Sequence, residues 1–214
     1  MCLLIAMFQV APDAPLIVAA NRDERLDRPA VPMTVLREHG PRILGGRDEL
    51  AGGTWLAVNE HGVVAGLTNQ PSADGRDPTK RSRGELPLAF AAYRSATEAV
   101  AGVRAELDPA VYNPCWMLVG DREALFSIGI SGGSEAEVAK LAPGLHVLEN
   151  APLQSGSAKA AFVRGLVADA LAKRRADDTA AGRRTDDAAA TVSALEVVLG
   201  DHQPAVPEPR TDAT

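Results

Sequence analysis

Apolar runs and turn-forming residues alternate along the first third of the chain. Cys2–Val10 and Leu16–Ala20 are apolar runs of strand length, and residues 11–15 between them contain two prolines. This pattern predicts two strands joined as a β-hairpin. A second hairpin is predicted from Thr54–Val58 and Val63–Thr68, because their connecting residues end in a glycine suited to a tight turn.

Two signals for helix starts come next along the chain. Ser82-x-x-Glu85 and Ser95-x-x-Glu98 are capping boxes, and each precedes an alanine-rich stretch. Two consecutive helices are therefore predicted over about residues 83–107. The pairs Gly45-Gly46 and Gly52-Gly53 indicate tight turns or a close approach of two backbones, since no helix with the lysine of a phosphate loop follows them.

The second half of the chain mixes short strands with longer helical stretches. Strands are predicted at Cys115–Gly120, Leu125–Ile130 and Leu145–Leu148, and helices at Ser157–Arg175 and Thr191–Leu199. Residues 176–187 are charged and small, which is typical of a mobile linker. Many antiparallel strands with grouped helices predict an α+β layered fold. We expect one domain over residues 1–200 and a disordered proline-rich tail over residues 201–214.

Composition narrows the range of partners. No apolar run in the 214 residues approaches the roughly 20 that a membrane helix needs, and Leu3–Val10 lacks the flanks of a secretory signal. We therefore expect no membrane span and a cytoplasmic location. A net charge of -6 argues against a nucleic-acid partner. Two cysteines and four scattered histidines give no disulfide framework and no metal-ligand spacing, so no metal is expected.

Cys2 is the strongest candidate for chemistry. If the initiator methionine is removed, residue 2 carries a thiol and a free α-amine on one carbon, which makes a nucleophile and a base in one residue. In the first predicted hairpin, Cys2 lies beside Arg22 and Asp23. The Arg22 guanidinium would favour the thiolate, and the Asp23 carboxylate would hold the ammonium. The alternative is that Cys2 is an inert residue of an early strand.

Seven motifs in order extend this interpretation to a family. They are Met1-Cys2-Leu3-Leu4, Ala19-Ala20-Asn21-Arg22-Asp23-Glu24, Arg28-Pro29, Gly45-Gly46-Arg47-Asp48, Gly52-Gly53-Thr54-Trp55-Leu56, Leu67-Thr68-Asn69 and Ser82-Arg83-Gly84-Glu85. Together they resemble the NRDE family, also called the transport and Golgi organisation 2 family. The resemblance covers most of residues 1–160.

This resemblance implies an N-terminal-nucleophile hydrolase-like fold, a four-layer αββα sandwich with two antiparallel sheets between helices. Residues 59–69 are also similar to choloylglycine hydrolase and penicillin V acylase. In those relatives a cysteine attacks an amide carbonyl with help from an arginine and an aspartate. The matching residues here are Cys2, Arg22 and Asp23. Asn69 and Asn150 match the two asparagines that build the oxyanion hole, although asparagine at a strand end also commonly satisfies backbone groups.

The end of the chain departs from the family pattern. Members typically continue to a strand with a Gly-Thr-Arg-Ser-like motif, whereas this chain ends at residues 209–214. We expect either a fragment or the loss of the family's last strands, which would leave one sheet edge uncovered.

The expected function is hydrolysis of an amide or thioester bond in a small acylated substrate, without an external cofactor. Asn21, Glu24, Arg47 and Arg83 are further candidates for substrate contacts. The alternative, suggested by the family's links to haem trafficking and acyl-CoA binding, is a non-catalytic carrier or chaperone of haem or acyl-CoA-type lipids. Haem is expected only under this alternative, with Cys2 or His146 as an axial ligand.

Three other conspicuous residues have an ordinary structural interpretation. Trp55 and Trp116 lie in predicted strands, where a tryptophan commonly anchors the core. Cys115 precedes Trp116 directly and is expected to be a small buried hydrophobe.

Overall fold

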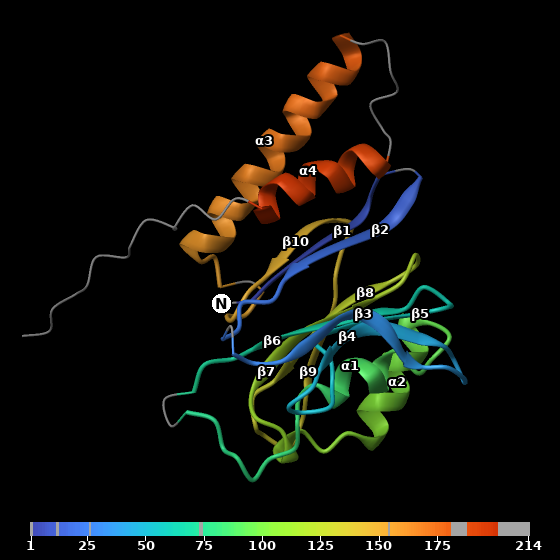
Figure 1. Cartoon of the computed structure of the whole chain (residues 1–214), viewed down its shortest axis with the longest axis vertical. Helices are drawn as coiled ribbons and strands as arrows, with labels where there is room; N and C mark the ends of the chain where they lie inside the picture. Colours follow the sequence, from blue (N-terminus) through green and yellow to red (C-terminus); the bar gives the residue numbers. More distant parts are fainter. Residues whose placement is uncertain are drawn as a thin grey trace, which may run out of the picture.

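Two antiparallel sheets lie face to face in the computed structural model, and helices cover their outer faces (Figure 1). The structure describes residues 2–11, 13–25, 27–72, 75–153, 155–180 and 188–200. Within this part of the chain, the smaller sheet has the strand order β10-β1-β2 and the larger has the order β3-β4-β5-β6-β7-β8-β9.

The strands follow the predicted apolar runs closely in most places. The small sheet consists of β1 (Leu3–Ala11), β2 (Ala14–Asn21) and β10 (Gly144–Leu148). The large sheet consists of β3 (Ala30–Arg37), β4 (Ile43–Asp48), β5 (Leu56–Asn59), β6 (Val64–Asn69), β7 (Cys115–Gly120), β8 (Leu125–Ile130) and β9 (Glu137–Lys140). The helices are α1 (Glu85–Phe90), α2 (Ala96–Glu106), the short 3-10 helix Pro109–Val111, α3 (Ala158–Ala180) and α4 (Ala188–Gly200).

Side chains of β1 alternate between two of the three interior spaces. Leu3, Ile5 and Met7 pack toward α3 and α4, and the even-numbered residues between them pack against the large sheet. A third cluster lies between the large sheet and the pair α1 and α2. The layer order is therefore α3 and α4, small sheet, large sheet, α1 and α2, which confirms the predicted αββα sandwich (Figure 1).

The first hairpin positions the candidate chemistry. In the β1–β2 pairing, Leu3 lies opposite Asn21, at the start of one strand and the end of the other. The next residues outward are Cys2 and Arg22, so the predicted hairpin brings them to the same end of the small sheet. β2 and β10 are the two edge strands of this sheet within the described residues.

Three strands were not predicted. β3 and β9 are edge strands with mostly exposed or half-exposed side chains, so they lack the apolar alternation of a half-buried strand. β4 contains Gly45 and Gly46, which suggested a turn. These strand positions need glycine because their neighbours leave no room for a side chain. A Cβ on Gly45 would lie 2.4 Å from the Leu56 carbonyl oxygen, and one on Gly46 would lie 2.3 Å from the Trp55 ring.

One of the two capping boxes was predicted wrongly. Ser95 caps α2 and accepts a hydrogen bond from the Glu98 N–H at 3.2 Å, as expected. The cap of α1 is Gly84, and Ser82 instead accepts the Gly84 N–H at 3.3 Å. The reason is that the Gly84 carbonyl binds the Thr54 N–H at 3.0 Å, which draws this segment toward the large sheet before the helix begins.

The C-terminal helices are longer than predicted. Residues 176–180 of the predicted linker belong to α3, and residues 181–187 lie outside the described part of the chain. The predicted tail, residues 201–214, also lies outside it. Among the described helices, none has the length and apolarity that crossing a membrane requires.

Candidate functional site

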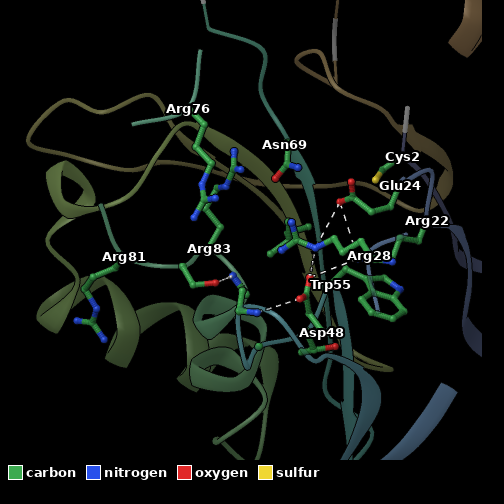
Figure 2. Close-up of a pocket in the computed structure, with 16 residues that line it drawn as sticks. Cys2, Arg22, Glu24, Arg28, Asp48, Trp55, Asn69, Arg76, Arg81 and Arg83 are labelled. Atoms are coloured by element: carbon green, nitrogen blue, oxygen red, sulfur yellow. Dashed lines mark hydrogen bonds and ion pairs between the residues drawn. The ribbon is translucent and has the colours of Figure 1, made fainter. Parts of the chain in front are cut away.

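A cavity of about 110 Å³ opens where the start of β1 meets the large sheet (Figure 2). Cys2 lines it from the residue before β1, and Asn69 lines it from the end of β6. The charged side chains around it are strongly unequal in sign: Arg22, Arg28, Arg76, Arg81 and Arg83 against Glu24 and Asp48. The cavity is thus a cationic pocket with a thiol at one side.

Close backbone contact brings the walls of this cavity together. A Cβ on Gly53 would lie 2.5 Å from the Gly84 carbonyl carbon, closer than any side chain allows. Gly52 has a positive φ of 74°, which suits a tight turn. Both features match the turns or close backbone approach predicted for these glycines. They hold the β4–β5 loop against the segment that carries Arg83.

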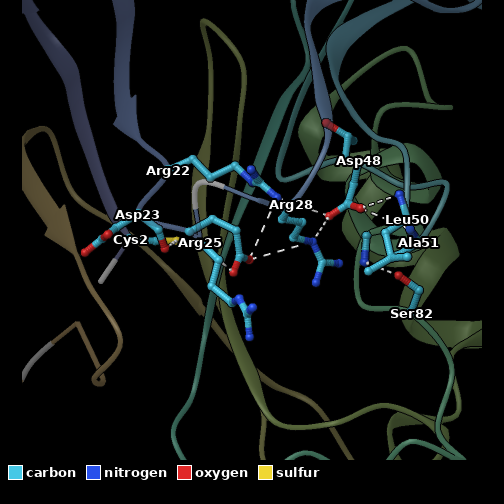
Figure 3. Close-up of polar contacts among 12 residues, drawn as sticks. Cys2, Arg22, Asp23, Arg25, Arg28, Asp48, Leu50, Ala51 and Ser82 are labelled. Carbon is cyan, nitrogen blue, oxygen red and sulfur yellow. Dashed lines mark hydrogen bonds and ion pairs between the residues drawn. The ribbon is translucent and has the colours of Figure 1, made fainter.

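Asp48 is the central carboxylate of the cavity (Figure 3). Its Oδ2 accepts a hydrogen bond from Arg28 Nε at 2.8 Å and one from Arg22 at 3.3 Å. Its Oδ1 accepts the Leu50 and Ala51 N–H groups, both at 3.0 Å. Burial alone would raise the pKa of Asp48, but the bonds from Arg28 and the two N–H groups outweigh burial and lower it. Asp48 therefore stays ionised and fixes both arginines.

Arg22 is held on three sides. Besides Asp48, it contacts Glu24 at 3.8 Å, and its guanidinium carbon lies 4.7 Å from the centroid of a Trp55 ring. Trp55 is therefore a wall of the cavity as well as a packing residue. Trp116 takes the predicted core position and packs in the cluster between the two sheets.

The Cys2 thiol is half-buried, and its Sγ lies 4.0 Å from the Asp23 carbonyl oxygen. Burial raises the pKa of the Cys2 thiol and Glu24 adds to this, while the charge of the chain's N-terminus, Arg22 and Lys159 act in the opposite direction. The net pKa is raised, so the thiolate that Arg22 was expected to favour is not the preferred form. This holds for the chain that retains Met1, in which the nitrogen of Cys2 is a peptide nitrogen.

Several predicted site residues lie together. Cys2, Arg22, Glu24, Asn69 and Arg83 all line the cavity. Asp23 directly follows Arg22 and meets Cys2 through its carbonyl oxygen (Figure 3).

Asn150 lies next to Asn69 but lines a different cavity. This second cavity has a volume of about 300 Å³ and shares Asn69, Arg76 and Arg83 with the first. The Asn150 Nδ2 donates to the Asn69 carbonyl oxygen at 2.5 Å. The amide group predicted for the oxyanion hole is therefore engaged with backbone in this structure.

Two predicted substrate contacts lie away from both cavities. Asn21 donates from Nδ2 to the Leu199 carbonyl oxygen at 2.9 Å, which ties β2 to α4. Arg47 is exposed, and its guanidinium bonds the Val35 carbonyl oxygen on the neighbouring strand at 3.4 Å. Asp48, the next residue of β4, points into the cavity instead, as expected from the alternation of side chains along a strand.

Sequence reasoning missed Arg28, Asp48 and Arg76 as cavity residues. Arg28 and Asp48 stand in two of the quoted motifs, so a search for opposite charges within the motifs would have found them. No local pattern points to Arg76.

Two observations on the described residues bear on metal and haem ligation. These residues contain no group of three or more His, Cys, Asp or Glu side chains placed to hold a metal ion. His146 bonds the Ala142 carbonyl oxygen through Nε2 at 2.9 Å. The cavity arginines are suited to an anionic group of a ligand.

Comparison with known proteins decides the family. The sequence model of the family described as Transport and Golgi organisation 2 matches residues 1–211. The chain belongs to the Transport and Golgi organisation 2 family. A homologue of this family from Bos taurus is 29% identical and covers 100% of this chain and 76% of its own length. One from Mus musculus is 30% identical and covers 82% of this chain and 66% of its own length.

Solved structures show the fold that this Transport and Golgi organisation 2 family member adopts. A Caenorhabditis elegans N-acylethanolamine-hydrolyzing acid amidase ortholog has a TM-score of 0.58 at 17% identity, covering 91% of this chain and 85% of that one. Penicillin V acylase from Agrobacterium tumefaciens has a TM-score of 0.53 at 13% identity, covering 92% and 71%. Both confirm the predicted N-terminal-nucleophile hydrolase-like fold, and at these identities they show the fold alone.

Proposed function

We propose that this family member is an N-terminal-cysteine hydrolase that cleaves the amide or thioester bond of a small acylated molecule. The observation that carries this proposal is the position of Cys2, which lies at the start of β1, lines a polar cavity and has Arg22 beside it. The fold supports it, because two structural neighbours are named as an amidase and an acylase.

The proposed cycle begins after Met1 is removed. The α-amine of Cys2 accepts the thiol proton, and the thiolate attacks the carbonyl carbon of the substrate. The tetrahedral intermediate collapses and expels an amine or thiol, which takes the proton from the α-ammonium. Water then attacks the acyl-enzyme with the same amine as base, which releases the acid and restores the thiol.

The negative charge that develops on the substrate oxygen needs a hydrogen-bond donor in the cavity near Cys2. The Asn69 side chain lines the cavity and fills this role in the proposal. Asn150 can donate to the oxyanion only if the hydrogen bond from its Nδ2 to the Asn69 carbonyl oxygen breaks. Arg22, fixed by Asp48, stabilises negative charge on the sulfur.

The test compares two cysteine variants. Intact mass and peptide mapping first establish whether Met1 is removed and whether a thiol-reactive acylating probe prefers Cys2. Turnover on a panel of amides and thioesters is then measured for Cys2→Ala and for Cys115→Ala, the buried cysteine of the described core. We expect loss of turnover with Cys2→Ala alone. Full turnover by Cys2→Ala, or a probe without preference for Cys2, contradicts the hydrolase.

A second candidate function is a carrier that binds an anionic ligand without cleaving it. The five arginines around the cavity favour this candidate, since guanidinium groups suit the anionic groups of a bound ligand. Acyl-CoA-type lipids and haem both carry the anionic groups that the arginines would hold. A carrier binds such a ligand equally well with Met1 retained and shows no turnover.

A further inference from the structure

The charges around the Cys2 cavity leave two arginines without a counter-ion. Both cavity carboxylates, Glu24 and Asp48, are bound to the pair Arg22 and Arg28. Arg81 forms an ion pair with Glu85, which does not line the cavity. No acidic partner within the described residues remains for Arg76 and Arg83.

Arg83 is half-buried, so its charged guanidinium group has lost part of its hydration. Its Nη1 donates to the Pro114 carbonyl oxygen at 3.1 Å, a neutral acceptor. Burial lowers the pKa of Arg83, and the nearby charges of Arg76 and Arg28 add to the shift, while Cys115 and Cys2 act in the opposite direction. A partly desolvated cation with two other cations nearby is stabilised most by an anion.

Arg76 is exposed at the rim, but the backbone that carries it is anchored. The buried side chain of Asn113 accepts the Asp77 N–H through Oδ1 and donates to the Asp77 carbonyl oxygen through Nδ2, both at 2.8 Å. This pair of bonds fixes the segment next to Arg76. Figure 2 shows Arg76 and Arg83 extending toward the same space near Asn69.

The same two arginines lie at the junction of both cavities, because they line the 110 Å³ and the 300 Å³ spaces alike. Gln70 and Asn150 also line the larger space. Their Oε1 and Oδ1 atoms are buried and have no hydrogen-bond partner among the described residues. A polar ligand that extends from the Cys2 side into the second cavity would pass both arginines.

We propose that Arg76 and Arg83 form an anion-binding subsite, and that the molecule held beside Cys2 carries a carboxylate or phosphate group bound there. Guanidinium groups suit both anions, since each presents paired N–H donors to two oxygens. The statement about the Cys2 substrate rests on the proposed function. The subsite itself does not, because it requires binding only.

The test uses two probes of the shared chemistry, inorganic phosphate and glutarate, titrated at constant ionic strength by calorimetry. The variants are Arg76→Gln, Arg83→Gln and the double variant. Arg122→Gln is the matched control, because Arg122 is exposed in the β7–β8 turn and lines neither cavity. Arg76→Gln changes an exposed side chain and so remains informative if the half-buried Arg83 is needed for folding.

We expect at least one probe to bind the wild-type protein and the double variant to bind it about tenfold or more weakly, as expected for the loss of charge-assisted hydrogen bonds. Arg122→Gln should stay within about twofold of wild type, the range of a screened surface charge. The probe that binds more tightly identifies the anion as phosphate or carboxylate. Absence of binding by wild type, unchanged binding by the double variant, or an equal loss in Arg122→Gln overturns the subsite.

Failure of the subsite and failure of the hydrolase are distinguishable. The titrations are repeated in Cys2→Ala, where binding that depends on Arg76 and Arg83 supports the subsite whether or not the wild-type protein turns over. If turnover is found, glutaryl and pentanoyl amides of one leaving group are compared. We expect Arg76→Gln to raise KM for the glutaryl amide and leave the neutral amide unchanged, whereas equal effects on both amides contradict a role in substrate binding.

Discussion

Replacing Asp48 with asparagine tests whether this carboxylate organises the cavity. The asparagine side chain has the same shape and can still accept the Leu50 and Ala51 N–H groups through Oδ1, but its Nδ2 cannot accept hydrogen bonds from the two arginines. The change removes the hydrogen bonds from Arg28 at 2.8 Å and from Arg22 at 3.3 Å. The Asp48 side chain that accepts them is 14% exposed. Hydrogen bonds to charged groups contribute about 1.5–3 kcal/mol each, and partial exposure lowers this, so we expect a total loss of about 2–3 kcal/mol.

The pH dependence gives the sharper assay. The pKa of Asp48 is lower in the folded chain than in the unfolded chain, where an aspartate titrates near about 3.9. The stabilisation is therefore complete well above the unfolded pKa and is lost as the pH falls through the folded pKa. In urea unfolding, the free-energy difference between wild type and Asp48→Asn should be largest near pH 7 and shrink below about pH 4.

Asp27→Asn is the matched control. Asp27 bonds Arg25 at 2.6 Å, a shorter distance than any bond of Asp48, but both side chains are mostly exposed. Solvent screens such a pair, so little change in unfolding free energy is expected. The reasoning is refuted if the two variants lose equal stability, or if the difference at Asp48 grows as the pH falls.

Three further predictions follow from the packing and the thiols. Gly53→Ala should cost about 1–3 kcal/mol in urea unfolding because its Cβ meets the Gly84 backbone. Gly165→Ala, with open space around it in α3, should instead stabilise the chain by up to about 1 kcal/mol through helix propensity; equal effects would contradict the close approach. Asn59→Ala removes four hydrogen bonds of a buried side chain and should lower the unfolding free energy by about 3 kcal/mol; a loss below about 1 kcal/mol would show that these bonds contribute little. Burial raises the pKa of Cys115 to about 12, so iodoacetamide at mildly alkaline pH should modify Cys2 alone in the folded chain, and mapped modification of Cys115 would contradict this.

The sequence predicted the fold where burial produces a regular pattern. β1, β6, β7 and β8 have a buried face on at least one side, and the residues of β2 are at least half-buried, so their apolar runs are visible. β3 and β9 are edge strands whose position depends on pairing with β4 and β8, which no local pattern records. β4 was not predicted because it contains two glycines, which usually indicate a turn. They are needed here because Trp55 and Leu56 pack too closely against them for a side chain to fit.

The same distinction applies to the site. Cys2 and Arg22 are brought together by one hairpin, and a hairpin register can be worked out from the sequence. Arg76 and Arg83 reach the cavity through long-range contacts, the first through Asn113 and the second through the Gly53–Gly84 approach. Such contacts join segments that are far apart in the chain. Arg83 was predicted because it lies in a family-like motif, whereas Arg76 lies in none of the quoted motifs and was missed.

The state of the N-terminus connects the two functional proposals. Burial and Glu24 raise the pKa of the Cys2 thiol more than the terminal ammonium, Arg22 and Lys159 lower it, so the surrounding positive charges alone do not supply a thiolate. An anion bound at Arg83 would offset part of the positive charge and raise that pKa further. The thiol proton therefore needs a base, and removal of Met1 provides one on Cys2 itself. A chain that keeps Met1 should bind phosphate or glutarate as well as the processed chain but show no turnover, because the subsite needs only the two arginines while the chemistry also needs the amine.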